Sequence, residues 1–293
     1  KTVNECLELI AKDLIDAKQL LWKFDTAKSF RRSDNFETAG SGETMFLIRR
    51  GFHLNYWATT ALLARVYLFY TGYYGKEPAN ITKAEVLQGL EEFIGVAESK
   101  GYGLVESYKD LWPAASSSWV KEGNKYVQTN TYVGDGNKET VLAQKFNYTQ
   151  NYNGDTDANR WLVMMGVRGV ISAPYGQGWG ACTVNPKIVN AFGNGDSRKT
   201  ASVIDLEGEG ITKGKDFEKT HVKDQREYTG FTVKKYTPMG EWRQDKDGVW
   251  SQVNAVLGLG EGDFQISQYQ DFVVMRYSDV LLMAAELGSP KAK

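Results

Sequence analysis

Apolar residues recur at helical spacing near both ends of the chain. In residues 2–21 one stripe holds Leu7, Ile10, Leu14, Ala17 and Leu21. Steps of three and four residues are typical of an amphipathic helix whose apolar side faces a core. Thr2 and Glu5 have the spacing of a capping box at its start. We therefore expect the first helix over these residues, with Cys6 buried as a free thiol.

Residues 53–100 predict two helices joined by a short loop. The first helix has an apolar stripe at helical spacing, formed by Leu54, Trp57, Ala61, Ala64 and Leu68. Gly72 follows this stripe, where glycine easily adopts the left-handed conformation of a helix C-cap. Thr82 and Glu85 form a second capping-box pattern, and Gly101 ends the helix that follows. This pattern is typical of a tetratricopeptide-like hairpin, which presents a surface more often than it performs chemistry.

A third helical pattern covers roughly residues 277–287. It carries Leu281, Ala284 and Ala285, and small residues allow helices to approach closely. We expect this last helix to pack against the helix of residues 53–71. The predicted fold class is therefore mainly α: a tetratricopeptide-like α-α superhelix with a loop-rich face and small β-hairpins.

Helical periodicity is absent from the long middle of the chain. Residues 116–137 are rich in Ser, Asn, Gly and Tyr, and we expect irregular loops there. Residues 140–146 alternate weakly as a strand would, and residues 245–248 predict a hairpin turn between Trp242 and Trp250. Because long loops in a compact fold are usually functional, we expect the binding site in this region.

Composition excludes some classes of function. The chain has 293 residues and a net charge of -1, so no basic face is implied and nucleic acid is a poor candidate partner. Aromatic residues make up 13% of the chain, with 8 Trp and 16 Tyr. Most of these rings are needed to fill a core, but some are candidates for stacking on sugars. The two cysteines are far apart and lack metal-ligand spacing.

Three blocks of sequence resemble the SusD/RagB family of outer-membrane nutrient-binding lipoproteins. The first comprises Arg49, residues 55–58 (NYWA) and residues 61–68 (ALLARVYL). The second is residues 181–198, ACTVNPKIVNAFGNGDSR, which matches a pattern of Pro, a short helix ending in Phe, and Gly-Asp-x-Arg. The third is residues 271–287, DFVVMRYSDVLLMAAEL. The blocks occur in the family's order over most of the chain.

The resemblance implies a surface protein that captures an oligosaccharide or another nutrient. In this family the protein forms a lid on a SusC-like TonB-dependent transporter, at the extracellular face of the outer membrane. A lipid anchor, absent from this chain, would hold it there. Against the family pattern, residues 1–293 form a single SusD-like domain that is incomplete at both ends. The resemblance implies no enzymatic activity and no cofactor.

Candidate ligand-binding residues lie in and beside a glycine-rich loop at residues 172–180. A sugar needs a flat apolar face for its C–H side and planar polar groups for its hydroxyls. The candidates that offer these groups are Trp179, Tyr175, Trp161, Gln177, Asn153 and Arg160. Glycines beside Trp179 would leave its ring open to a ligand. The same rings could instead fill the junction between loops and helices.

The sequence has only weak motifs for metal binding or catalysis. Residues 155–160 begin like a calcium loop, but Arg160 occupies the sixth position, where an EF-hand needs glycine, so we expect a turn and no metal. His53 and His221 lie outside any zinc or nucleophile motif. A carbohydrate-active hydrolase that uses two carboxylates is the alternative hypothesis, because a catalytic pair has no sequence signature.

Overall fold

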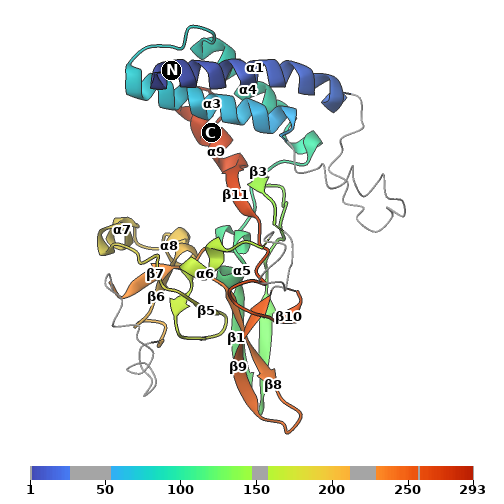
Figure 1. Ribbon diagram of the computed structural model, residues 1–293, viewed down its shortest axis with the longest axis vertical. Helices are drawn as coiled ribbons and strands as arrows, with labels where there is room; N and C mark the ends of the chain where they lie inside the picture. Colours follow the sequence, from blue (N-terminus) through green and yellow to red (C-terminus); the bar gives the residue numbers. More distant parts are fainter. Residues whose placement is uncertain (1, 27–53, 147–157, 212–228, 257, 293) are drawn as a thin grey trace. The chain divides into compact units, whose positions relative to one another are not determined.

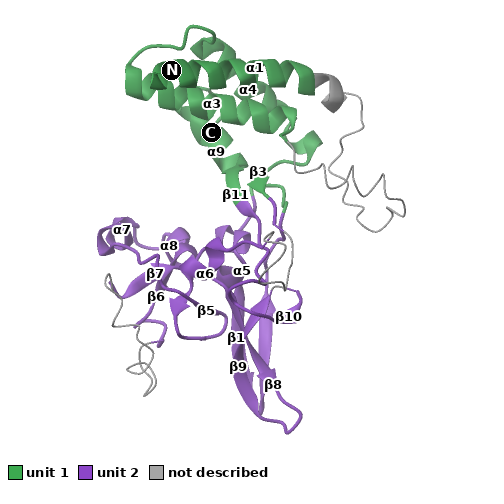
Figure 2. Ribbon diagram, in the orientation of Figure 1, with its two compact units in different colours: residues 1–104, 136–144, 273–293 green, residues 105–135, 145–272 purple. Residues whose placement is uncertain are grey.

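A computed structural model describes residues 2–26, 54–146, 158–211, 229–256 and 258–292 of the chain. These residues form two compact units (Figure 2). Unit 1 consists of residues 1–104, 136–144 and 273–293, and unit 2 of residues 105–135 and 145–272. Each unit thus combines segments that are distant in the sequence. The expected single, incomplete domain stays a prediction.

The described residues of unit 1 form four helices of ten residues or more (Figure 1), which are α1 (Val3–Thr26), α3 (Tyr56–Tyr74), α4 (Lys83–Val96) and α9 (Tyr277–Glu286). Helix α3 packs against α1 and α4, and α9 packs against both α3 and α4. The predicted helical hairpin and the predicted packing of the last helix are therefore confirmed. The expectation for Cys6 was wrong, since this residue is free but exposed.

Glycine ends α3 three residues later than expected. The helix continues through Gly72 to Tyr74, and Gly75 is the residue with left-handed backbone (φ 65°). Its N–H donates to the Thr71 carbonyl, which closes the last turn. The predicted capping box of Thr82 and Glu85 at the start of α4 is confirmed. After α4 a short 3₁₀ turn, η2 (Glu98–Lys100), leads to Gly101, which is also left-handed.

Small and large side chains alternate in the core of unit 1. Ala61, Ala64 and Ala284 are fully buried, and the rings of Trp57 and Phe93 stack with centroids 5.1 Å apart. The buried side of α9 consists of Tyr277, Val280, Met283 and Ala284. Ala285 is exposed, so the apolar stripe expected from the sequence was misplaced by part of a turn.

Enlarging either fully buried alanine should overpack this core. We expect Ala61→Leu and Ala284→Leu each to lower the free energy of unfolding by ~1–3 kcal/mol, because the added atoms have no space. Ala285→Leu, one position along α9 on its exposed side, is the matched control and should change stability by less than ~0.5 kcal/mol. Urea denaturation of the four proteins measures the difference. Equal stability of all four would show that the core is misassigned.

A two-stranded sheet completes unit 1. Strand β3 (Thr140–Gln144), expected from the sequence, pairs with β11 (Phe272–Arg276), which leads directly into α9. The Arg65 guanidinium on α3 donates to the Val274 carbonyl at 2.9 Å. Arg276 pairs with the buried Glu139 at 3.0 Å. These contacts tie the strands to the helices.

Unit 2 contains two β-hairpins. The first joins β1 (Ser117–Glu122) and β2 (Lys125–Asn130), so the irregular loops expected here were wrong. Its turn contains Gly123 with φ 61°, and Trp119, Val120 and Val127 favour extended backbone. The many Ser, Asn and Lys residues hid this strand signal because both sides of the hairpin are largely exposed.

The second hairpin joins β8 (Met239–Gln244) and β9 (Trp250–Val256) through the predicted turn at residues 245–248. The Asp245 carboxylate accepts hydrogen bonds from the N–H groups of Asp247 and Val249, both at 2.9 Å. Strand β10 (Gly260–Glu261) pairs with β9 and makes this sheet three-stranded, in the order β10-β9-β8.

Short elements surround the hairpins. The helical ones are η3 (Tyr108–Leu111), α5 (Pro113–Ser116), α6 (Trp161–Met165), α7 (Pro186–Ala191) and α8 (Ser197–Ser202). The strands are β4 (Val167–Arg168) with β5 (Gln177–Gly178), which are parallel, and β6 (Val203–Asp205) with β7 (Phe231–Val233), which are antiparallel. Asn185 caps α7, and Asp196 caps α8 while pairing with Arg198 at 2.6 Å.

Candidate functional site

Helix α6 and the segment after β5 are joined through their backbones. The N–H of Trp179 donates to the Val163 carbonyl at 2.6 Å, and the N–H of Ala181 donates to the Met164 carbonyl at 2.9 Å. A third bond runs from Gly180 to the Gly166 carbonyl at 2.9 Å. The last turn of α6 therefore fixes the backbone that carries Trp179.

Gly178 and Gly176 allow other backbone segments to approach closely. A Cβ atom on Gly178 would lie 2.4 Å from the Cα of Gly166 and 2.7 Å from the Val163 carbonyl oxygen. Gly176 is equally confined, since a Cβ there would lie 2.3 Å from the Met239 carbonyl oxygen. From the sequence, these glycines were expected to leave the Trp179 ring open to a ligand. Their observed role is instead to let backbones touch.

Trp161 and Trp179 are the two exposed aromatic candidates. Trp161, the first residue of α6, is 60% exposed, and Trp179 is 38% exposed. Neighbouring protein atoms cover only part of each indole, so each ring offers an apolar face to solvent. Because their backbones belong to one hydrogen-bonded substructure, the two rings are presented from a single rigid base.

Asn159 holds the start of α6. Its side chain is almost fully buried, its amide N–H donates to the Gln270 carbonyl at 2.7 Å, and its carbonyl oxygen accepts from the Trp161 N–H at 3.0 Å. Its own backbone N–H donates to the Gln268 carbonyl at 2.7 Å. The Asn159 amide thus positions Trp161 from within the core.

Tyr175 does not present a ring to solvent, and its expected stacking role is corrected here. It is 6% exposed and belongs to the core around Ile204 and Met239. Its hydroxyl donates to Glu209 at 2.5 Å, and Lys234, which pairs with Glu209 at 3.0 Å, lies over the ring. Burial, with the nearby Glu209 charge, raises the pKa of Tyr175. Such a satisfied network is structural.

The polar candidates have different surroundings. Gln177 is half-buried in β5, and its backbone N–H donates to the Asn254 side chain at 2.8 Å. Arg160 is the N-cap residue of α6, directly before Trp161, and is half-buried. Asn153 lies outside the described residues, as does most of the candidate calcium loop. The structure thus places Arg160 and Trp161 at the start of α6, and Gln177 and Trp179 in and directly after β5. Helix α6 and strand β5 pack together.

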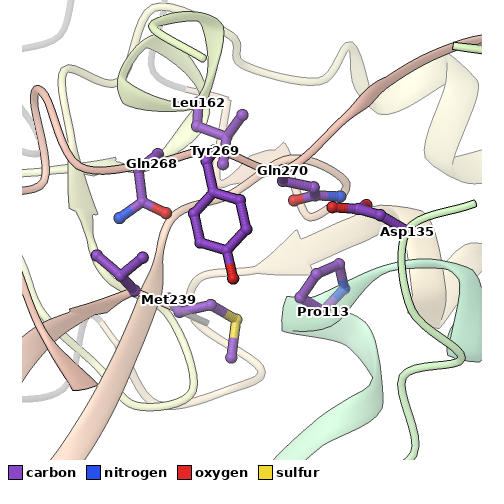
Figure 3. A pocket seen from close by; sticks show the side chains of 8 residues that line it. Pro113, Asp135, Leu162, Met239, Gln268, Tyr269 and Gln270 are labelled. Atoms are coloured by element: carbon purple, nitrogen blue, oxygen red, sulfur yellow. The ribbon is translucent and has the colours of Figure 1, made fainter. Parts of the chain in front are cut away.

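Asp135 and Asp271 form a pair of neighbouring carboxylates that the sequence did not predict. Asp271 is buried, its backbone N–H donates to the Asp135 carboxylate at 3.4 Å, and Lys145 pairs with its side chain. Tyr132 donates to Asp135 at 2.6 Å. The cavity beside Asp135 has a volume of about 10 Å³, and the Tyr269 ring is one of the side chains that line it (Figure 3). A space of this size holds about one water molecule and no sugar ring.

Burial, reinforced by the Asp135 charge, raises the pKa of Asp271 to about 6 against the opposing effect of Lys145. Between about pH 4 and pH 6 the folded protein therefore keeps a proton that the unfolded chain has lost. As the pH rises through that window, the free energy of unfolding should fall by up to ~1.4 kcal/mol per pH unit. Asp271→Asn removes this titration, so its stability relative to the wild type should rise from pH 4 to pH 6. Urea denaturation at each pH measures it, and a pH-independent difference would contradict the assignment.

Comparison with known proteins assigns the family. The model of the SusD family matches residues 138–287, which is more than half of the chain. The chain belongs to the SusD family. Two of the three sequence blocks that suggested this assignment fall inside the matched range. No match was found among curated proteins.

Solved SusD-like structures share the fold. A laminarin-binding SusD-like protein is 19% identical with a TM-score of 0.55, covering 83% of this chain and 46% of its own. Surface glycan-binding protein A from Bacteroides thetaiotaomicron, in complex with laminarihexaose, is 16% identical with a TM-score of 0.53, covering 86% and 50%. The mainly helical, tetratricopeptide-like fold class is confirmed. The chain spans about half the length of these neighbours.

Three further features of the described residues concern membrane-spanning helices, metal-ligand clusters and the state of the cysteines. Within the described ranges, no helix has the length and apolar character needed to cross a bilayer. Across the same residues, no three His, Cys, Asp or Glu side chains gather as a metal site requires. Both cysteines are free.

Proposed function

We propose that this SusD-family chain binds a glycan at the cell surface and does not cleave it. The observation that carries the proposal is the pair of part-exposed tryptophans, Trp161 and Trp179, on one hydrogen-bonded base. Two structural neighbours, a laminarin-binding SusD-like protein and a surface glycan-binding protein in complex with laminarihexaose, support a carbohydrate as the ligand class.

In this proposal the two indoles stack on the C–H faces of sugar residues. Each indole supplies a flat apolar surface and loses little conformational freedom on binding, because the backbone beneath it is fixed. Arg160 and Gln177, next to the indoles in sequence, donate hydrogen bonds to sugar hydroxyls. Asn153, which lies outside the described residues, is proposed as a further amide contact.

We further propose that the bound glycan passes to a SusC-like TonB-dependent transporter in the outer membrane. Membership of the SusD family supports this partner and an extracellular location. A lipid anchor in the longer protein would hold the chain at the membrane.

Retention on a panel of immobilised polysaccharides tests the proposal. Native affinity electrophoresis with β-glucans, α-glucans, xylans and mannans in the gel should slow the wild type in at least one of them. Trp161→Ala/Trp179→Ala should migrate as in a gel without polysaccharide. Unretarded migration of the wild type in every gel, confirmed by calorimetry with soluble oligosaccharides, would contradict the proposal.

A further inference from the structure

A hollow of about 320 Å³ lies between strand β2 and the β8–β9–β10 sheet of unit 2. Apolar residues line part of it: Met239, Ala255 and Val256, all at least 95% buried. Polar side chains line another part, namely Gln128, Asn130 and Glu241. The volume is at the lower end of the range for small-ligand sites, and the mixture of an apolar base with a few polar groups is typical of them.

The polar groups of the hollow differ in how firmly they are held. The Asn130 carbonyl oxygen accepts from the Tyr132 N–H at 2.8 Å, which leaves its NH₂ group to donate elsewhere. Arg243 bonds one carboxylate oxygen of Glu241 and also Glu261, which fixes the carboxylate. Among the described residues, the Gln128 amide has no hydrogen-bond partner.

Trp119 neighbours a side chain that lines this hollow. It lies directly opposite Gln128 in the β1–β2 register, so the two side chains share one side of the hairpin. The Trp119 indole therefore reports on changes around Gln128 without itself lining the hollow.

Aromatic stacking holds the two hairpins together. Tyr126 on β2 stacks on Trp242 of β8 with centroids 3.8 Å apart and planes inclined by 7°. The Trp250 ring of β9 also lies 5.5 Å from Tyr126. The hollow therefore lies between two elements whose mutual position is fixed by packed rings, which favours a preformed site.

We infer that this hollow is a second glycan-contact site that takes a single pyranose residue. The sugar's C–H face lies over the floor of the hollow, where Gly240, Gly258 and Gly260 leave room above the buried Met239, Ala255 and Val256. Its hydroxyls bond Gln128, Asn130 and Glu241. The inference rests on the proposed function, since it assigns part of the same ligand to a place away from Trp161 and Trp179. The site would hold a neighbouring part of the glycan chain.

Fluorine NMR of protein labelled with 5-fluorotryptophan tests both places in one experiment. Each of the eight Trp resonances is assigned by a Trp→Phe variant. The probes are disaccharides, which are short enough to occupy the two places independently: maltose, cellobiose, laminaribiose, xylobiose and mannobiose. We expect one of them to move the Trp119 resonance as well as those of Trp161 and Trp179.

Gln128→Ala/Glu241→Gln should raise the midpoint of the Trp119 titration about tenfold and leave that of Trp179 within twofold. Val127→Thr is the matched control, because Val127 neighbours Gln128 on the strand but points to the other side of the hairpin. It should leave both midpoints unchanged.

The outcomes separate the two proposals. Movement of Trp161 and Trp179 without Trp119 would overturn the second site and support the first. A Trp119 midpoint that is unchanged in Gln128→Ala/Glu241→Gln would also overturn the second site. If no resonance moves with any probe, both proposals are wrong.

Discussion

Removing the indole of Trp179 or Trp161 should weaken glycan binding at least tenfold for each residue, about 1.4 kcal/mol or more. The reason is that each ring supplies most of one stacking surface, and truncation to alanine leaves the sugar's C–H face in water. The double variant should lose about a hundredfold in affinity, as two independent tenfold losses would give. Isothermal calorimetry with the retained oligosaccharide gives the dissociation constants.

Controls separate a lost stacking surface from a lost fold. Trp161→Ala should change the free energy of unfolding by less than ~0.5 kcal/mol, because the ring is 60% exposed. Trp179→Phe keeps an aromatic face and should retain most of the affinity. Tyr73→Ala removes a ring of unit 1 that is 73% exposed, more than either indole, and should not affect binding. Full affinity in Trp161→Ala/Trp179→Ala would place the site elsewhere.

Gly178→Ala should lower the free energy of unfolding by ~2–3 kcal/mol. The new Cβ would lie 2.4 Å from the Gly166 Cα, and the obstructing atoms are backbone, which cannot rotate away as a side chain can. Glycan affinity should fall with stability, because the Trp179 backbone is held through this contact. Urea denaturation and calorimetry measure the two effects.

Gly193→Ala is the matched control for this substitution. A Cβ there meets nothing within 4 Å, and the position has no positive φ, so stability should stay within ~0.5 kcal/mol of the wild type. A Gly178→Ala variant as stable as Gly193→Ala would show that α6 and β5 do not make the close contact described above.

The helices were predictable because local signals and tertiary packing agree in them. The Thr82–Glu85 capping box and the stripe that contains Ala61 and Ala64 each specify the observed element. The end of α3 was misplaced because a glycine inside a helix and a glycine at its end look alike in sequence. Gly72 is tolerated in the helix, and Gly75 supplies the left-handed turn.

Candidate site residues were only partly predictable. Aromatic content drew attention to Trp161, Tyr175 and Trp179, but exposure is a tertiary property. Tyr175 is buried because Glu209 and Lys234, distant in sequence, come to its hydroxyl and ring. The same limit applies to the β1–β2 hairpin, whose exposed polar residues gave no alternating pattern. The hollow beside Gln128 depends on two hairpins that lie more than one hundred residues apart.

The claim that the chain binds a glycan and leaves it intact is tested most directly by a mass-balance experiment. The protein is incubated with the oligosaccharide it retains, and bound, free and shortened glycans are quantified over a day by chromatography. We expect the glycan to be recovered at its original length, in a saturable complex with the protein. Steady release of shorter products, abolished by Asp135→Asn or Asp271→Asn, would contradict the account and support a hydrolase.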